Sequence, residues 1–177
     1  DHLMVVKNNY FALPKDSKAG FIANGDQIII QRILRIQERH GFRFAKAEVS
    51  LVDYPDEPEF ETYLLLDAIY VDRPSMTYED GNRLYKSVEQ EYAHIKTKYK
   101  RFQAIKTDPY FNALQVKFAY AITCHKAQGG QWKNVFIEQG YLPDNTVDKE
   151  YLRWLYTAFT RAVDKVYLIG FKSNFYK

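Results

Sequence analysis

Four polar side chains that could contact phosphate groups follow directly after an apolar run at residues 118–122. The run, Phe-Ala-Tyr-Ala-Ile, has the length and the aromatic and β-branched content of a buried strand. Two glycines close the polar segment, whose side chains are those of Thr123, His125, Lys126 and Gln128. Hydroxyl and imidazole groups bind phosphate oxygens without reading base sequence, and glycine lets a ligand approach the backbone. A buried strand with such groups at its C-terminal end is the usual geometry of a site in an α/β sheet.

A second segment, residues 156–162, places an arginine on a predicted helix. Helical spacing predicts an apolar face made of Leu152, Leu155, Tyr156, Phe159 and Val163. The same spacing predicts an opposite polar face made of Arg153, Thr157, Thr160, Arg161 and Asp164. The guanidinium of Arg161 is planar and always charged, so it can stabilise the charge that spreads over a transferred phosphoryl group. The alternative is a surface arginine that pairs with Asp164 or Glu150.

The two segments together resemble a pair of helicase motifs. Residues 119–137, with the core Thr-Cys-His-Lys-Ala-Gln-Gly, resemble motif V of superfamily 1 helicases. Residues 156–162, Tyr-Thr-Ala-Phe-Thr-Arg-Ala, resemble motif VI. The combination is most similar to the RecD/Dda branch and covers about residues 116–170, the region of a UvrD-like helicase C-terminal domain. Val-Lys-Asn-Asn-Tyr at 6–10 and Asn-Gly-Asp at 24–26 resemble the start of the SH3-like barrel inserted into the second RecA-like domain of this branch.

The resemblance assigns roles to the polar residues. It implies that Arg161 is an arginine finger, the catalytic residue that this chain would contribute. It implies that Thr123 and His125 contact the backbone of single-stranded DNA, with Lys126 reaching either DNA or solvent. The residues expected near the nucleotide are Gln128, Gly129, Gln131, Thr157 and Arg161, although some relatives carry a Glu in place of Gln131. The alternative for His125 is a structural turn histidine.

A complete nucleotide site is absent from the sequence. A phosphate-binding loop needs Gly-x-x-x-x-Gly-Lys-Ser/Thr. Gly20 and Gly25 have the glycine spacing, but Asp26 and Gln27 follow them. We therefore expect ATP and Mg²⁺ to be bound mainly by an N-terminal domain outside this chain, and the isolated chain to be inactive and to hold no cofactor or metal of its own.

Composition narrows the remaining classes. The chain has 177 residues, enough for one ordinary domain or two small ones, and 46% of them are hydrophobic. Its one cysteine, Cys124, excludes an internal disulfide and indicates a reducing compartment, so we expect a cytoplasmic protein. The four histidines are far apart in the sequence and lack the close spacing of zinc ligands, so no zinc site is predicted. No stretch is long and apolar enough to span a bilayer.

Charge is distributed unevenly along the chain. Acidic residues accumulate between Lys46 and Arg73, and basic residues dominate from Arg83 to Lys117. The basic part could follow phosphates, or it could be a solvated helix face. An aromatic stripe in the same part recurs at helical spacing, which favours a core position over a base-stacking platform.

Residues 1–115 are expected to form the inserted barrel with a long helix. Strands are predicted at 3–6, 27–36, 42–52 and 60–71, and the fourth is expected to pair with the third. Residues 42–52 alternate between apolar and polar types, which is the period of a half-exposed antiparallel strand. Thr77, with Asp80 three residues on, has a capping-box spacing, and the periodic stripe predicts one amphipathic helix over about 77–103. The stripe consists of Leu84, Val88, Tyr92, Ile95, Tyr99 and Phe102.

Residues 116–177 alternate between strand and helix, which predicts a parallel sheet. Strands are expected at 116–122, 134–137 and 166–169, with Asp148 as the N-cap of the intervening helix. The predicted fold class is therefore α/β: a partial RecA-like, P-loop NTPase-type parallel sheet domain with an inserted SH3-like barrel and a long helix.

The resemblance implies the C-terminal part of an ATP-dependent DNA helicase, similar to the alpha subunit of exodeoxyribonuclease V. Its partners would be single-stranded DNA, the N-terminal RecA-like domain and possible nuclease or repair proteins of a recombination pathway. The alternative is a non-catalytic nucleic-acid-binding module, in which Arg161 would not matter to activity. A nuclease is disfavoured because no Asp/Glu-x-Lys pattern follows Asp56 in the neighbouring strand.

Overall fold

The computed structural model describes residues 1–73, 75–140 and 147–176. It divides into two compact units, Asp1–Tyr120 and Ala121–Lys177, each of which has its own sheet. No helix among the described residues has both the length and the apolar character that crossing a membrane requires.

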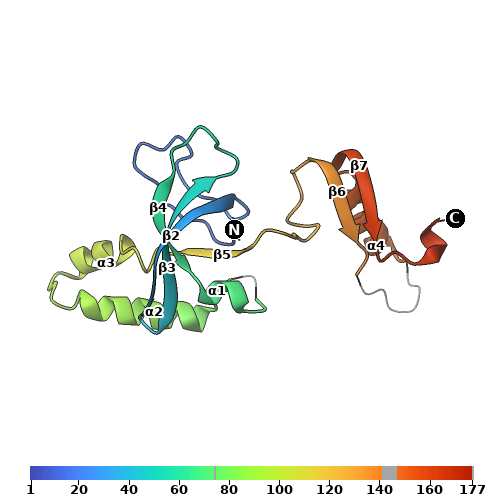
Figure 1. Cartoon of the computed structure of the whole chain (residues 1–177). Coiled ribbons are helices and arrows are strands. Elements are labelled where there is room, and N and C mark those ends of the chain that lie inside the picture. Colours follow the sequence, from blue (N-terminus) through green and yellow to red (C-terminus); the bar gives the residue numbers. More distant parts are fainter. Residues whose placement is uncertain (74, 141–146, 177) are drawn as a thin grey trace. The chain divides into compact units, whose positions relative to one another are not determined.

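The first unit is built on a closed five-stranded barrel (Figure 1). Its strands, in spatial order, are β1 (His2–Val5), β2 (Gln27–Arg39), β3 (Phe42–Leu51), β4 (Phe60–Leu65) and β5 (Leu114–Phe118). All neighbours are antiparallel except β4 and β5, which run parallel. The predicted pairing of the third and fourth strands is confirmed and is antiparallel, and the small closed barrel fits an SH3-like fold.

Alternation along β3 places one set of side chains inside the barrel. Ala45, Ala47 and Val49 are fully buried there, together with residues from the other four strands. The small alanines leave room for larger side chains of the facing strands, such as Ile28 and Leu64. The period of two in the sequence therefore predicted the buried face of this strand correctly.

A tight turn joins β2 to β3. Arg39 pairs with Phe42, so that His40 and Gly41 form a two-residue hairpin loop, and both have positive φ (54° and 72°). This is the pattern of a type I′ turn, in which a glycine at the second position avoids the strain that a Cβ would bring.

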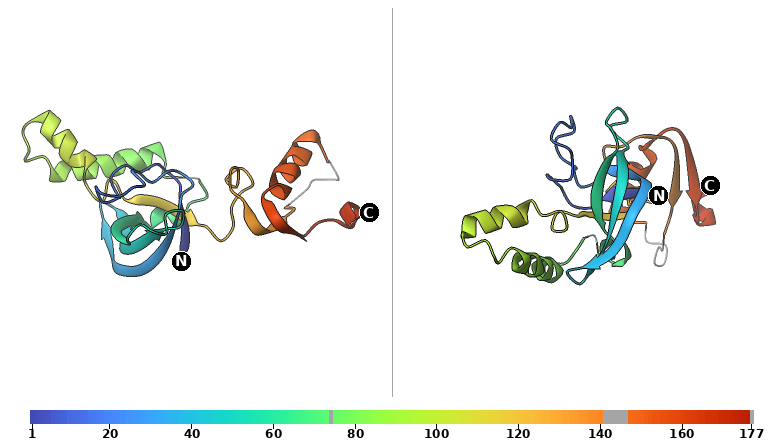
Figure 2. Two further views of the ribbon diagram at one scale, coloured as in Figure 1. Left: turned by 90° about the horizontal axis from the view of Figure 1, so that it is seen from above. Right: turned by 60° about the vertical axis from the view of Figure 1, so that its left-hand side comes forward.

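The predicted single helix over 77–103 is wrong, because the structure has two helices. These are α2 (Tyr78–Glu91) and α3 (Lys98–Lys106), which project together from the barrel (Figure 2), and a short α1 (Asp67–Tyr70) precedes them. Val88 and Ile105 are buried in the same core cluster. One continuous helix would hold them roughly 25 Å apart, so the break allows both to reach that core.

The first unit extends a few residues beyond the predicted boundary at 115/116. Val116 pairs with Val5 and is fully buried in the barrel, and Phe118 pairs with Leu3. The strand expected at 116–122 is therefore β5, which closes the barrel and ends at Phe118 instead of opening the parallel sheet.

The second unit contains a parallel pair of strands and one helix. These are β6 (Trp132–Glu138), α4 (Lys149–Phe159) and β7 (Ala162–Ile169), followed by a short 3-10 helix (Ser173–Tyr176). β6 and β7 run parallel, as alternation of strand and helix predicted. Asp148 caps α4 by accepting a 2.7 Å hydrogen bond from the backbone N–H of Tyr151, which confirms the predicted N-cap.

Candidate functional site

The segment 123–130 is a compact series of turns. The backbone N–H of Ala127 donates to the carbonyl of Thr123 (3.0 Å), and that of Gly130 donates to Ala127 (3.2 Å). The hydroxyl of Thr123 also accepts a long bond from the backbone of Lys126 (3.4 Å). Ala127 is buried and holds the turns against the unit, so that the polar side chains around it point outward.

All of the predicted contacts in this segment are exposed. The side chains expected to bind DNA and those expected near the nucleotide lie on the same short stretch of backbone: Thr123, His125, Lys126, Gln128, Gly129 and Gln131. The structure therefore brings the two predicted sets together. The apolar run before them is not the buried strand that the sequence predicted, because Tyr120 and Ala121 are exposed and the strand ends at Phe118.

Arg161 lies in the turn between α4 and β7, one residue beyond the C-cap of the helix, not on the helix face as predicted. Its Nη1 donates to the carbonyl of Gly130 (3.1 Å), Nη2 donates to the hydroxyl of Thr160 (3.1 Å), and Nε donates to the carbonyl of Thr157 (3.1 Å). The backbone carbonyl of Arg161 accepts from the N–H of Trp132 (2.9 Å). The side chain thus joins the two segments that the sequence singled out.

The charge of Arg161 has no acidic partner among the described residues. The three groups that accept from it are neutral, and the nearby Glu150 pairs with Arg153 instead (2.6 Å). The alternative of a surface arginine paired with Asp164 or Glu150 is therefore not what the structure shows. A half-buried guanidinium that is held by neutral acceptors keeps its full attraction for an anion.

Cys124 lies close enough to Arg161 for the positive charge of the arginine to act on its thiol. Its thiol is half-buried and donates to the carbonyl of Trp154 (3.4 Å). Burial raises the pKa of Cys124, while the positive charge of Arg161 acts in the opposite direction. A thiol with a raised pKa is a poor nucleophile, so Cys124 has a packing role here.

Two anchors of Arg161 were not assigned a role by sequence reasoning. These are the carbonyl of Gly130 and the hydroxyl of Thr160. Gly130 also lies under the indole of Trp132, where an added Cβ would stand 2.3 Å from Cη2. The doubled glycine before a tryptophan was the available signal, since close approach of a ring to the backbone needs a residue without Cβ.

The predicted faces of α4 are not the observed ones. Leu152, Tyr156 and Phe159 are exposed, Tyr156 by 72%, whereas Ala158 is buried and Thr157 half-buried. The described sheet is only two strands wide, so the helix covers it with a narrow strip around Ala158 and the larger apolar side chains extend past it. The opposite face of the sheet is also uncovered, where the exposed rings of Phe136 and Tyr167 stack with centroids 4.6 Å apart.

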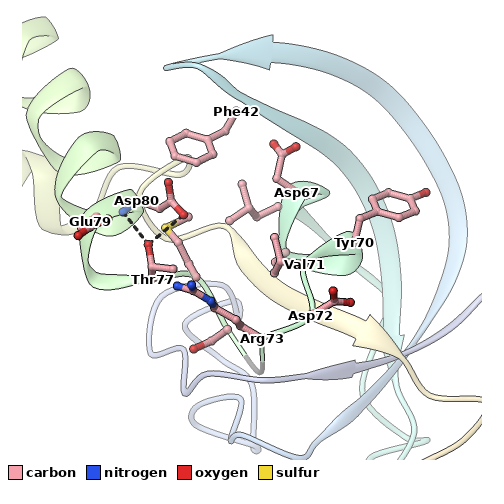
Figure 3. A pocket seen from close by; sticks show the side chains of 13 residues that line it. Phe42, Asp67, Tyr70, Val71, Asp72, Arg73, Thr77, Glu79 and Asp80 are labelled. Carbon is pink, nitrogen blue, oxygen red and sulfur yellow. Dashed lines mark hydrogen bonds between the residues drawn. The ribbon is translucent and has the colours of Figure 1, made fainter.

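A cavity of about 530 Å³ lies elsewhere, in the first unit (Figure 3). Phe42, Leu65 and Met76 contribute its apolar lining. Its charged lining consists of Asp67, Asp72, Arg73, Glu79 and Asp80. Excess negative charge repels phosphate, so this cavity is no candidate for a nucleotide. Nor are three His, Cys, Asp or Glu side chains grouped to hold a metal ion anywhere in the described parts of the chain.

Comparison with known proteins finds a family match in the second part of the chain. Residues 118–169 match the family model of the UvrD-like helicase C-terminal domain. This match supports a helicase C-terminal domain. The matched region contains the turns at 123–130, Arg161 and all of β6, α4 and β7. The match is consistent with a helicase-related function and with nucleic-acid binding in this part of the chain.

Two relatives have no described function. An uncharacterized protein of Acanthamoeba polyphaga mimivirus is 29% identical over 102 residues, which cover 51% of this chain and 20% of the relative. An uncharacterized protein of Methanocaldococcus jannaschii is 39% identical over 69 residues, which cover 39% of this chain and 6% of the relative. The chain thus spans a fifth or less of the length of these curated relatives.

Proposed function

We propose that this chain is the C-terminal part of an ATP-dependent DNA helicase of the RecD-like branch, which couples ATP hydrolysis to movement along single-stranded DNA. The observation that carries the proposal is the bond between Arg161 Nη1 and the carbonyl of Gly130. It ties the candidate for phosphoryl chemistry to the turn that bears the candidate DNA contacts, within a segment that matches a helicase family.

In this proposal Arg161 acts as an arginine finger. A guanidinium with a fixed position stabilises the charge on the equatorial oxygens of the transferred phosphoryl group, without reorganising during the reaction. Its hydrogen bonds to Gly130, Thr157 and Thr160 supply that fixed position. Gln128, Gly129 and Gln131 would border the nucleotide from the adjoining turn.

Thr123, His125 and Lys126 would hold the DNA backbone. Short polar donors bind phosphate independently of base sequence, as a motor that moves along any strand requires. These side chains and the carbonyl that anchors Arg161 lie on one short series of turns. A structural change at the nucleotide would therefore be transmitted directly to the bound DNA.

ATP and Mg²⁺ would be bound mainly by another domain of the full-length protein. The residues of this chain do not fit a complete site, since it lacks the lysine-containing phosphate loop and its described part offers no grouped metal ligands. We place the second unit at the end of a larger, RecA-like parallel sheet. Parallel strands are normally covered on both faces, and Phe136, Tyr167 and the exposed apolar residues of α4 would be buried by the remainder of that domain.

The test is ATP turnover by the full-length protein with and without single-stranded DNA. Arg161→Ala should lower the DNA-stimulated rate by about 10³-fold or more, and Arg161→Lys should restore little of it because an ammonium lacks the planar fork. The matched control is Arg153→Ala, which removes an exposed arginine of α4 that pairs with Glu150. Wild-type turnover in the Arg161→Ala protein would rule out the finger role. Absence of DNA-stimulated turnover in the wild-type protein, with DNA binding retained, would favour the non-catalytic binding module instead.

A further inference from the structure

The helix α3 carries an outward-facing stripe of cations and aromatic rings. Lys98, Phe102 and Lys106 recur every four residues, and Tyr99 lies one turn before Phe102 on the same side of the helix. Tyr99 is 71% and Phe102 52% exposed. The sequence pattern had favoured a core position for these two rings, and the structure contradicts it.

The packing of α3 explains why the rings face outward. Ile105 is the one fully buried residue of the helix, and it occupies the core cluster beneath α2. Arg101 turns back to donate twice to the carbonyl of Ile95 (2.9 and 3.1 Å), which closes the loop between the two helices. Tyr99 is two residues before Arg101 and lies on the opposite side of the helix, whereas Phe102 lies beside Ile105 at the edge of the buried side, and both rings are exposed.

This part of the chain is strongly basic. Between Ala93 and Thr107 there is no acidic residue, whereas the cations are Lys96, Lys98, Lys100, Arg101 and Lys106. The first turn of α3 likewise lacks an acidic side chain. Cations near the positive end of a helix dipole repel it, and a bound polyanion would relieve that repulsion.

The stripe continues onto the loop between β1 and β2, which we call the N-terminal loop of the first, or barrel, unit. The ammonium of Lys106 stands 5.8 Å from the ring centroid of Phe11, which is itself exposed. Next to it in the chain, Tyr10 stacks on Phe21 with centroids 5.1 Å apart. Aromatic rings and ammonium groups therefore lie together along the stripe from Lys98 to Phe11.

We propose that this stripe, defined by Lys98, Tyr99, Phe102, Lys106 and Phe11, is a contact surface for single-stranded nucleic acid. Ammonium groups neutralise phosphates, and aromatic faces stack on unpaired bases of any type. A duplex would hide its bases from the rings, and an acidic polypeptide would use the charges but not the flat aromatic faces. The surface belongs to the barrel unit and uses neither Arg161 nor ATP, so it goes beyond the helicase function proposed above.

The experiment measures the fluorescence anisotropy of a labelled oligothymidylate titrated with the 177-residue chain. Tyr99→Ala and Phe102→Ala should each weaken binding about tenfold. The matched control is Tyr78→Ala, which removes an 85% exposed tyrosine from the acidic first turn of α2 and should leave the affinity unchanged. Circular dichroism checks that each variant is folded.

Salt dependence tests the cationic part of the surface. The double variant Lys98→Gln, Lys106→Gln should reduce the slope of log K against log salt by about 1.4, because two phosphate contacts are lost. The control is Lys15→Gln, Lys18→Gln, which removes two exposed lysines from the N-terminal loop and should keep the slope.

Several outcomes would overturn the proposal that the stripe binds single-stranded nucleic acid. These are no binding by the wild-type chain at low salt, equal losses in the test and control variants, or competition by polyglutamate that is as strong as competition by unlabelled oligonucleotide. His125→Ala separates this proposal from the helicase function. If only His125→Ala weakened binding, the α3 surface would be ruled out as a binding site and the proposed DNA contacts of the second unit would be supported. Weaker binding with Tyr99→Ala and Phe102→Ala alone would do the reverse.

Discussion

At the scale of a single residue, the acceptors of Arg161 determine how its guanidinium is held. Three of its five N–H groups donate to two backbone carbonyls and one hydroxyl, which orient the guanidinium but leave its charge uncompensated. A carboxylate partner would have oriented it equally well and cancelled its field. The arrangement suits a group that must attract an anion, and it depends on Gly130 as much as on the arginine.

Gly130→Ala should destabilise the second unit. The new Cβ would lie 2.3 Å from Cη2 of Trp132, so the rigid indole or the turn has to move, at a cost of about 1–3 kcal/mol. Hydrogen exchange of residues 121–177, measured at increasing denaturant concentration, gives the change in the free energy of unfolding.

The control for this change is the Trp132→Ala background. There the additional cost of Gly130→Ala should nearly vanish, because the clash partner is gone. A cost that is the same in both backgrounds would show that the glycine is needed for another reason.

Tyr92→Phe should change the alkaline stability of the barrel unit. The pKa of Tyr92 is raised by burial and by the hydrogen bond that its hydroxyl donates to Asp108 (2.9 Å). The folded state therefore holds this proton more tightly than the unfolded state. The stabilisation is complete below a pH of about 10, the ordinary value for tyrosine, and is lost as pH rises further.

The phenylalanine variant should consequently lose about 1 kcal/mol at neutral pH and show a smaller loss of stability above pH 10 than wild type. Urea denaturation at several pH values checks both parts. An unchanged alkaline slope would mean that the proton of Tyr92 is not linked to folding.

At the scale of elements, α2 and α3 of the barrel unit begin differently. Thr77 caps α2 by accepting from the backbone N–H of Asp80 (3.0 Å), as the capping-box spacing predicted. Thr97 stands at the same position of α3, but its side chain makes no capping hydrogen bond. One sequence signal, a threonine before a helix, thus has two structural outcomes.

Thr77→Ala should therefore destabilise the barrel unit by about 1 kcal/mol, whereas Thr97→Ala should have almost no effect. Thermal or urea unfolding of the two variants beside wild type makes the comparison. Equal losses would show that the threonines act through something other than capping.

At the scale of the whole chain, the two units have separate interiors. Both clusters of buried apolar residues lie within residues 1–120, one inside the barrel and one beneath α2 and α3. The second unit buries less, with Ile137 and Ala158 among its few fully enclosed apolar side chains. Because neither buried cluster of the first unit includes a residue of the second, we expect a mutation inside the barrel to leave the interior of the second unit unchanged.

Leu64→Ala tests this independence. Removing a fully buried leucine from the barrel should cost about 3 kcal/mol in that unit and leave hydrogen exchange in residues 121–177 unchanged. Ile33→Ala, at an exposed isoleucine of β2, is the matched control and should cost far less. Faster exchange in the second unit of the Leu64 variant would contradict independence.

Patterns with a strict local period were predicted well. The alternation in β3, the caps at Thr77 and Asp148, and the parallel pairing of β6 with β7 follow from interactions within a few residues or within one strand–helix–strand unit. The resemblance found at residues 116–170 overlaps the family match at 118–169, and the site residues inside it remain predictions of role.

Sequence alone determined which residues could do chemistry and which segments could be strand or helix, because types and spacings are local properties. Only the tertiary structure decided which faces are buried. It broke the predicted helix so that Val88 and Ile105 could reach one core, turned Tyr99 and Phe102 outward, and moved Val116 from a parallel sheet into the barrel. It also joined Arg161 to Gly130 across 31 positions of sequence. These outcomes depend on which segment packs against each face. The hydrophobic effect stabilises the burial of any apolar surface, so the sequence pattern does not specify which other part of the chain covers it.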